Sequence, residues 1–197
     1  MTVQPGSNNG VATSKKSSIH STTPVSNEIG IDYSFREITS EKLPELATKF
    51  VPRSGPKPKT NNNNNSSDNK EGEEEKKVAV KAVKLNNNQL TDVGGLFSAL
   101  SAVVLQPSGL TKLDLSFNAI RKIPSSFSEF SKLKFLYVHG NDIHDVKHLT
   151  ILGNFRELLK FSIHGNPLEA EVPEYKWFLL AHVPSLKQLN FTTLSTG

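Results

Sequence analysis

From residue 80 onward, apolar residues recur with one fixed spacing. After the first apolar residue of each unit, others follow three and five positions later, then an Asn at eight and another apolar residue at ten. Apolar positions two residues apart point to one face of a strand, so each unit predicts a short strand with one buried face. A fifth, shortened unit reads Leu186, Leu189 and Phe191. The four full units begin at Val80, Leu110, Leu133 and Leu158.

Repeats of this kind set the fold, because no single unit can bury both of its apolar faces. The spacing L-x-x-L-x-L-x-x-N-x-L is that of leucine-rich repeats. It predicts an α/β fold: a right-handed solenoid of about five units, with a parallel β-sheet on the concave face and strands about 4.8 Å apart. An Asn side chain carries both a donor and an acceptor, so one per unit predicts a structural ladder along the turns. Its members are Asn88, Asn118, Asn141 and Asn166.

The segment 29–50 has a regular apolar pattern of its own. Alternating apolar residues from Ile29 to Phe35 predict a strand, and Ser40 is expected to cap a short helix with Pro44 in its first turn. We expect this docking segment to cover the open edge of the first repeat strand or to bind a partner. A chance apolar patch in a loose tail is the alternative. The docking residues are Ile31, Tyr33, Phe35, Arg36, Leu43, Leu46 and Phe50.

Two polar stretches flank this segment. Residues 1–28 are rich in Ser, Thr, Asn and Gly, and residues 51–77 run through an Asn tract at 61–65 into a Glu/Lys-rich stretch. Neither can bury enough apolar surface to offset chain entropy, so we expect a disordered N-terminal tail and a disordered linker. The repeat domain then covers 78–197, with a C-terminal cap from about residue 166.

Composition narrows the functional classes. The 197 residues include no Cys, which excludes a disulfide scaffold, a zinc–thiolate site and a cysteine nucleophile. The same absence points to a reducing compartment, so a cytoplasmic protein is expected. The longest apolar runs fall far short of the roughly 20 residues of a membrane span, which predicts no membrane partner. Lys and Arg number 23 against 19 Asp and Glu and form pairs rather than a stripe, so no nucleic-acid partner is expected.

The repeat register places alternate strand residues on the concave face, which is the candidate binding surface. Phe135 and Tyr137 are expected to stand exposed at its centre, where no core role explains them. Three lysines surround them, and Asp114 is the only acid that the register places nearby. A protein partner with an acidic surface, within a large assembly, is therefore predicted. An ordinary scatter of apolar surface is the alternative. The predicted contact residues are Lys84, Lys112, Asp114, Phe135, Tyr137, His139, Lys160 and His164.

His139 and His164 occupy equal places in adjacent units, so their rings are expected about one strand spacing apart. Two such rings are close enough to share a metal ion or a proton. The register supplies neither an acid in their row nor a third ligand, and Gly140 and Gly165 explain the recurrence as a turn preference. We therefore predict no catalytic residue, no metal and no cofactor. A metal-dependent hydrolase centred on this pair is the alternative from another class.

Several motifs resemble a known group of intracellular proteins. The unit lengths and the absence of Cys caps resemble repeats of the protein phosphatase regulator type. The C-terminal segment resembles the cap shared by the axonemal dynein light chain with leucine-rich repeats and the spliceosomal A-prime protein, and its matching residues are Asn166, Pro167, Leu168, Tyr175, Phe178, Leu179, Pro184, Leu186 and Leu189. The pentapeptide Asp32-Tyr33-Ser34-Phe35-Arg36 is the most specific element of the likeness, which covers about 29–58 and 78–197. The other motifs that carry it are 115–118, 136–141 and 164–167.

This resemblance to the intracellular leucine-rich repeat family with a C-terminal cap implies a function. It implies a cytoplasmic, non-catalytic scaffold or adaptor that binds proteins. The relatives that share the cap further imply a structural component of a cytoskeletal assembly such as the axoneme of the cilium. A phosphatase-type regulatory subunit is the alternative within the same class. The Asn-rich insertion at 61–65 departs from the family pattern.

Overall fold

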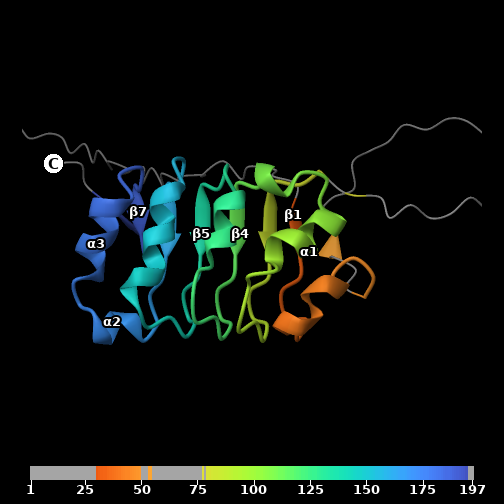
Figure 1. The fold of residues 1–197 in the computed structure, drawn as a ribbon, viewed down its shortest axis with the longest axis horizontal. Helices are drawn as coiled ribbons and strands as arrows, with labels where there is room; N and C mark the ends of the chain where they lie inside the picture. The colour runs from red at the N-terminus through yellow and green to blue at the C-terminus, as the bar shows by residue number, and fades with distance from the viewer. Residues whose placement is uncertain (1–29, 50–52, 55–76, 78, 195–197) are drawn as a thin grey trace, which may run out of the picture.

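The computed structural model describes residues 30–49, 53–54, 77 and 79–194. Their strands form one continuous sheet, and the helices lie along one face of that sheet (Figure 1). Neighbouring strands follow the order β2-β1-β3-β4-β5-β6-β7-β8. Strand β1 and strands β3 to β7 are parallel and in register, whereas β2 and β8 pair antiparallel at the two ends. The predicted leucine-rich repeat solenoid is confirmed. The strands are β1 (Gly30–Asp32), β2 (Arg53–Ser54), β3 (Ala82–Lys84), β4 (Lys112–Asp114), β5 (Phe135–Tyr137), β6 (Lys160–Ser162), β7 (Gln188–Leu189) and β8 (Thr192–Thr193).

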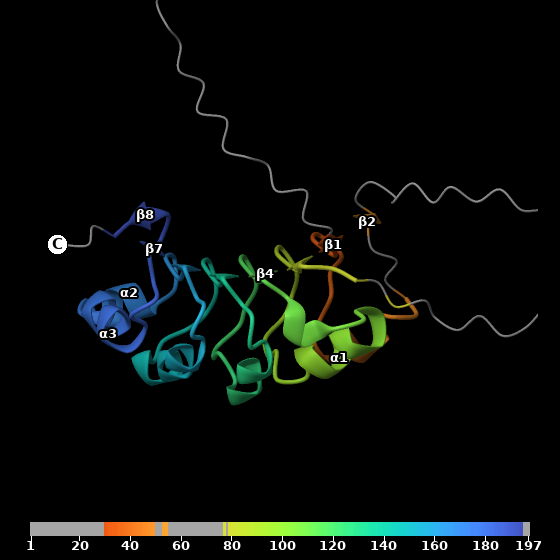
Figure 2. The same ribbon diagram turned by 90° about the horizontal axis from the view of Figure 1, so that it is seen from above.

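Short helices line the convex side, opposite the sheet (Figure 2). Four of the seven helices in the described residues are 3-10 helices, of three to nine residues. Between the two layers lies one continuous core, to which the middle return segments contribute the buried Phe127, Phe130, Leu149 and Leu152. The helices are η1 (Ser40–Glu45), α1 (Leu96–Val103), η2 (Pro107–Gly109), η3 (Ser125–Glu129), η4 (Val146–Asn154), α2 (Leu168–Glu171) and α3 (Tyr175–His182).

The predicted docking segment is itself a repeat unit. Ile31 pairs with Val83 in parallel register, and the backbone N–H of Tyr33 donates to the carbonyl of Lys84. Tyr33 and Ile38 are fully buried, at the places that Leu85 and Leu90 hold in the next unit. The sheet therefore contains six parallel strands, one more than the five units that the spacing predicted.

Three details of the docking segment differ from the prediction. Phe35 is 64% exposed instead of facing the core, because the chain leaves the strand at Asp32 and turns at Phe35 with a φ of 56°. The segment from Ser40 forms a 3-10 helix rather than an α-helix, and the hydroxyl of Ser40 does not cap it. That hydroxyl instead accepts the N–H groups of Thr91 and Asp92 in the first repeat, at 2.9 and 2.8 Å. Leu43 and Leu46 are buried, whereas Ile29 and Phe50 lie outside the described residues.

The boundaries of the other predicted segments are described only in part. The tail at 1–28 lies outside the described residues, as does most of the linker at 51–77. Within the predicted linker, Arg53 and Ser54 form strand β2, which pairs with β1. The sequence analysis did not predict this strand.

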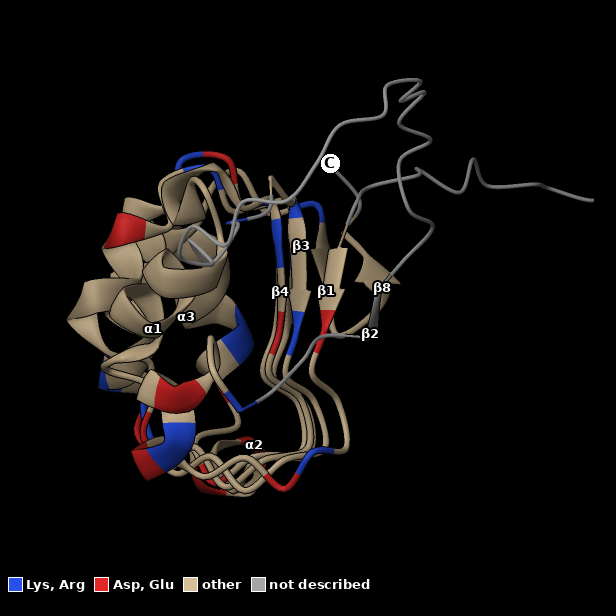
Figure 3. Cartoon of the chain, turned by 90° about the vertical axis from the view of Figure 1, so that its right-hand side faces the viewer, with Lys and Arg blue, Asp and Glu red and all other residues tan. Residues whose placement is uncertain are grey.

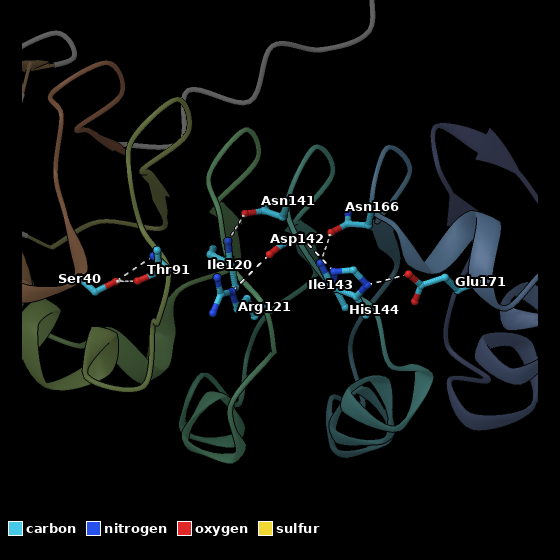
Figure 4. Close-up of polar contacts among 10 residues, drawn as sticks. All are labelled: Ser40, Thr91, Ile120, Arg121, Asn141, Asp142, Ile143, His144, Asn166 and Glu171. Atoms are coloured by element: carbon cyan, nitrogen blue, oxygen red, sulfur yellow. Dashed lines mark hydrogen bonds and ion pairs between the residues drawn. The ribbon is translucent and has the colours of Figure 1, made fainter.

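The four ladder asparagines repeat one hydrogen-bonding pattern between neighbouring units. Figure 4 shows the bonds that Asn141 and Asn166 accept from Ile120 and Ile143. The side-chain oxygen of Asn141 accepts the backbone N–H of Ile120 at 3.0 Å. Its amide nitrogen donates to the carbonyls of Leu115, in the preceding unit, and Val138, in its own unit, at 3.0 and 2.9 Å. Asn88, Asn118 and Asn166 make equivalent contacts.

A second, charged set of contacts joins the units outside this ladder (Figure 4). His144 Nδ1 lies 2.8 Å from Glu171 Oε1, and His144 Nε2 lies 3.1 Å from Asp142 Oδ1. The hydrogen bonds to Glu171 and then to Asp142 raise the pKa of His144. Arg121 Nε contacts the other oxygen of Asp142 at 3.3 Å. All four side chains are largely open to solvent, so these contacts add little stability next to the asparagines.

Replacing Asn141 with Ala should lower the stability of the fold. The substitution leaves an N–H and two carbonyls without their side-chain partner, at a cost of about 1 to 3 kcal/mol for each buried group that stays unsatisfied. Chemical denaturation, followed by circular dichroism, measures the change in unfolding free energy. Asn154→Ala serves as the control, because Asn154 is exposed at the end of η4. Equal midpoints for the two variants would contradict a structural role of the ladder.

Candidate functional site

Residues on alternate strand positions form two rows across the concave face. Figure 3 colours the basic and acidic residues along the strands. The structure places the six predicted strand contact residues in these rows: Lys112, Phe135 and Lys160 in the first, and Lys84, Asp114 and Tyr137 in the second. The parallel register aligns each row, so side chains from neighbouring units lie side by side. The other two predicted contact residues, His139 and His164, follow the C-terminal ends of β5 and β6.

Lysine side chains cover the two predicted aromatic anchors in part. The Lys112 Nζ lies 5.5 Å from the centroid of the Tyr137 ring, and the Lys160 Nζ lies 5.6 Å from that of Phe135. Such cation–π contacts hold the ammonium groups over the rings. Phe135 and Tyr137 are therefore half-buried, where the register predicted exposed side chains. Burial and then the charge of Asp114 raise the pKa of Tyr137.

The concave face carries a second acid that the sequence prediction missed. Strand β1 brings Asp32 beside Lys84 in the second row, and Lys84 Nζ lies 3.8 Å from Asp32 Oδ2. Asp114 is thus not the only acid near the lysines, because the N-terminal segment belongs to the sheet. One signal was present in the sequence: Asp-x-Ser-Phe occurs both at 32–35 and at 114–117.

The two histidines lie about one strand spacing apart, as their equal places in adjacent units predicted, and their rings stack. The ring centroids of His139 and His164 are 4.7 Å apart, and the ring planes differ by 8°. Ser162 Oγ lies 3.1 Å from Nδ1 of each ring. Burial and then the charge of His164 lower the pKa of His139, while Asp114 acts in the opposite direction. A lowered pKa favours the neutral form of the His139 ring.

The hydroxyl between the two histidines is buried. Ser162 has no exposed surface, so a substrate cannot reach its hydroxyl. Within the described ranges, no group of three or more His, Cys, Asp or Glu residues is placed to hold a metal ion. In the same part of the chain, no helix has the length and apolar character needed to cross a membrane.

Two exposed phenylalanines extend the histidine stack into an aromatic cluster. The ring centroid of Phe117 lies 5.0 Å from that of His139. Phe191 lies 5.5 Å from His139 and 5.6 Å from His164. Tyr137, 5.7 Å from Phe191, completes the group. We use the term aromatic cluster for Phe117, Tyr137, His139, His164 and Phe191.

Sequence reasoning missed both phenylalanines of this cluster. The spacing of the fifth unit placed Phe191 inward with Leu189, but Phe191 is 55% exposed. Asn190 and Phe191 have φ angles of 49° and 63°, and this tight turn reverses the chain into β8. Phe117 is 54% exposed at the residue before Asn118, a position for which the repeat pattern specifies no residue type. Turn conformation, not strand alternation, places both rings on this face.

Gly140 has a specific role in holding the aromatic cluster together. A Cβ added at Gly140 would lie 2.7 Å from Cδ1 of Phe117, which is shorter than any tolerated contact. At Gly165 the nearest atom would lie 3.5 Å away, in ordinary contact. Both glycines have positive φ angles, of 65° and 69°, so both substitutions share the same backbone strain.

Gly140→Ala should therefore destabilise the protein more than Gly165→Ala and should displace the Phe117 ring. Thermal unfolding compares the two variants, and the NMR shifts of His139 report whether Phe117 still packs edge-on against it. The matched strain at Gly165 makes it the control. If both variants lose equal stability and leave the His139 signals unchanged, Phe117 does not depend on the space at Gly140.

Comparison with known proteins agrees with the repeat architecture. A family model described as Leucine rich repeat matches residues 79–143. Leucine-rich repeat-containing protein 51 of Bos taurus is 31% identical over 164 residues, which cover 82% of this chain and 77% of the bovine protein. The proteins of that name from Mus musculus and Homo sapiens are 29% and 28% identical over 162 residues, with the same coverage. Among solved structures, the Drosophila melanogaster SNF/U2A' complex is similar with a TM-score of 0.49 and 23% identity, covering 59% of this chain and 63% of that chain.

Proposed function

The chain belongs to the family of leucine-rich repeat-containing protein 51, and from this premise we propose that it is a non-catalytic scaffold that binds a partner protein on its concave face. Leucine-rich repeat solenoids serve as protein-interaction modules, because their curved sheet offers an extended surface to a partner. The aromatic cluster carries the proposal, because it extends from Tyr137 on β5 to the turns that follow the strands. Aromatic rings that stand partly open to solvent on a concave face have the character of interface anchors.

The charges around the cluster support a partner with an acidic surface. Lys84, Lys112 and Lys160 lie in the two rows, while Asp32 and Asp114 oppose them. Asp32 is already engaged by Lys84, so the lysines on β4 and β6 supply the excess positive charge. An acidic partner would gain association rate from this field and lose it as salt is added.

We place this scaffold in the cytoplasm, within a large cytoskeletal assembly such as the axoneme of the cilium. The likeness of residues 166–189 to the cap of an axonemal dynein light chain supports this setting. Antibody detection in cilia that have been stripped of membrane tests it, because an axonemal component stays with the stripped cytoskeleton. Complete release into the detergent-soluble fraction would contradict the axonemal setting and leave the binding role standing.

Tyr137→Ala should weaken partner binding without unfolding the protein. Its ring lies on the concave face, outside the core, and loss of an interface anchor costs about 2 kcal/mol or more of binding free energy. The partner is first captured by the full chain from an extract and identified, and titration calorimetry then measures its affinity for each variant. A captured phosphatase catalytic subunit would favour the regulatory-subunit alternative.

Trp177→Ala is the matched control for this experiment. Trp177 is 74% exposed on α3, so its removal also deletes an aromatic side chain from the surface, but away from the sheet. The proposal expects unchanged affinity for this variant. Wild-type affinity for Tyr137→Ala, together with weaker binding by Trp177→Ala, would move the interface to the cap helix.

A further inference from the structure

One position in each of the first five units holds a left-handed backbone conformation. This position directly precedes the ladder asparagine, or Arg36 in the first unit. Its φ angle lies between 54° and 69° in five successive units. The residues are Phe35, Asn87, Phe117, Gly140 and Gly165. Asn and Gly accept this conformation readily, whereas a bulky side chain in it is an outlier.

Packing in the core does not explain the two phenylalanines at this position. Phe35 is 64% exposed and Phe117 is 54% exposed, so most of each ring lies in solvent. They are also among only six large apolar side chains exposed in the described part of the chain. A residue that is both strained and exposed loses stability on two counts, a combination typical of functional positions.

The backbone before each phenylalanine is held in the same way. Asp32 Oδ1 accepts the backbone N–H of Ser34 at 2.9 Å and also bonds its hydroxyl. Asp114 Oδ1 accepts the N–H and the hydroxyl of Ser116 at 3.1 and 2.6 Å. These turns fix the direction of the chain just before the ring, so the phenylalanines are presented in a set position. A presented ring loses little conformational entropy when a partner covers it.

We propose that Phe35, Phe117 and Phe191 form a docking edge for an amphipathic acidic helix of a partner protein. Phe191 extends the edge across the histidine stack, because its ring contacts both His139 and His164. The proposal rests on the proposed function and specifies the class of partner. The apolar face of the helix packs on this phenylalanine edge, and its carboxylates face the lysines of the two strand rows.

Charge complementarity selects this occupant. Lys112 and Lys160 lie in the first strand row, one row further from the edge than Lys84, and neither has an ion-pair partner among the described residues. The Nζ of Lys112 reaches over the ring of Tyr137, which contacts Phe191. The nearby carboxylates of Asp32 and Asp114 are bonded to the serines of their own turns. Both carboxylates keep their charge, and Lys84 pairs with Asp32. The three lysines of the two rows outnumber these two acids, so a helix whose acidic flank lies over Lys112 and Lys160 meets excess positive charge, whereas a basic or purely apolar helix leaves it uncompensated.

The spacing of the edge fits a helix that crosses the strands. Phe35 and Phe117 are two strand steps apart, which is roughly 10 Å at a strand spacing of about 4.8 Å. Two turns of an α-helix rise about 10.8 Å, so residues about seven apart on the helix meet the two rings. The smaller Asn87 lies between them and leaves room for the residue of the intervening turn.

A designed peptide tests this class of partner directly. The probe is a fluorescein-labelled helix of about 18 residues, with leucines on one face and glutamates along the adjacent flank. Fluorescence anisotropy measures its affinity for the full chain. Two control peptides carry serine in place of leucine and lysine in place of glutamate. We expect binding of the probe, at least tenfold weaker binding of each control, and loss of affinity at high salt.

The double variant Phe35→Asn/Phe117→Asn separates docking from folding. Asn87 shows that asparagine accepts this backbone conformation, so the variant should keep or raise the thermal midpoint. It should bind the probe at least tenfold more weakly. A lowered midpoint would instead assign the two rings to the structure and overturn the proposal.

The remaining outcomes separate this proposal from the proposed function. Equal affinity of the wild type and the double variant, or no binding of the acidic probe to the wild type, overturns the phenylalanine edge. In either case, weaker binding of the captured partner by Tyr137→Ala still supports a binding role for the concave face. Unchanged affinity of that partner for Tyr137→Ala counts against the concave face itself, whatever the probe does.

Discussion

Each ladder asparagine bonds its own unit to the unit before it, and the rest of the solenoid depends on this connection. The amide nitrogen joins one carbonyl on each side of the junction, and the oxygen accepts an N–H from the preceding turn. These backbone groups lie beyond the strand ladder, so the sheet does not satisfy them. A unit separated from its neighbour would expose apolar surface and also leave polar groups unpaired. The stack is therefore stable only as a whole.

The same connection explains why the N-terminal segment belongs to the domain. Asn88 has no earlier full repeat to bond, and the segment supplies what is missing. The backbone N–H groups of Arg36 and Ile38 donate to Asn88 Oδ1, and Asn88 Nδ2 donates to the carbonyl of Tyr33. The fit is imperfect, because the buried hydroxyl of Tyr33 has no hydrogen-bond partner among the described residues, and burial raises its pKa to about 12. The antiparallel strands β2 and β8 then cover the two ends of the parallel sheet, where open edges would invite association.

The sequence pattern predicted the elements that follow from periodicity. The strands from Val83 to Leu189, their register and the stacking of His139 on His164 all derive from the repeat spacing. The pattern failed where a turn overrides alternation. The alternating apolar pattern predicts that Phe35 and Phe191 face the core. Both residues instead lie in turns with positive φ angles, and their side chains are exposed to solvent. Asp32 was missed for a different reason, since its place on the concave face depends on pairing between β1 and β3, about 50 residues apart in sequence.

Neighbouring units also touch at the left-handed position. Phe117 occupies it in one unit, and its ring rests over Gly140, which occupies the same position in the next. The glycine thus does more than accept a positive φ angle, because it also leaves the volume that the ring fills. That ring in turn packs edge-on against His139, whose partner His164 contacts Phe191 from the C-terminal hairpin. A single chain of contacts therefore runs along the edge of the sheet from β4 to the final turn. The positive φ angles of Phe117 and Phe191 cost of order 1 to 3 kcal/mol each in backbone strain. The packing of the surrounding stack offsets this cost, and the two rings are held facing the solvent.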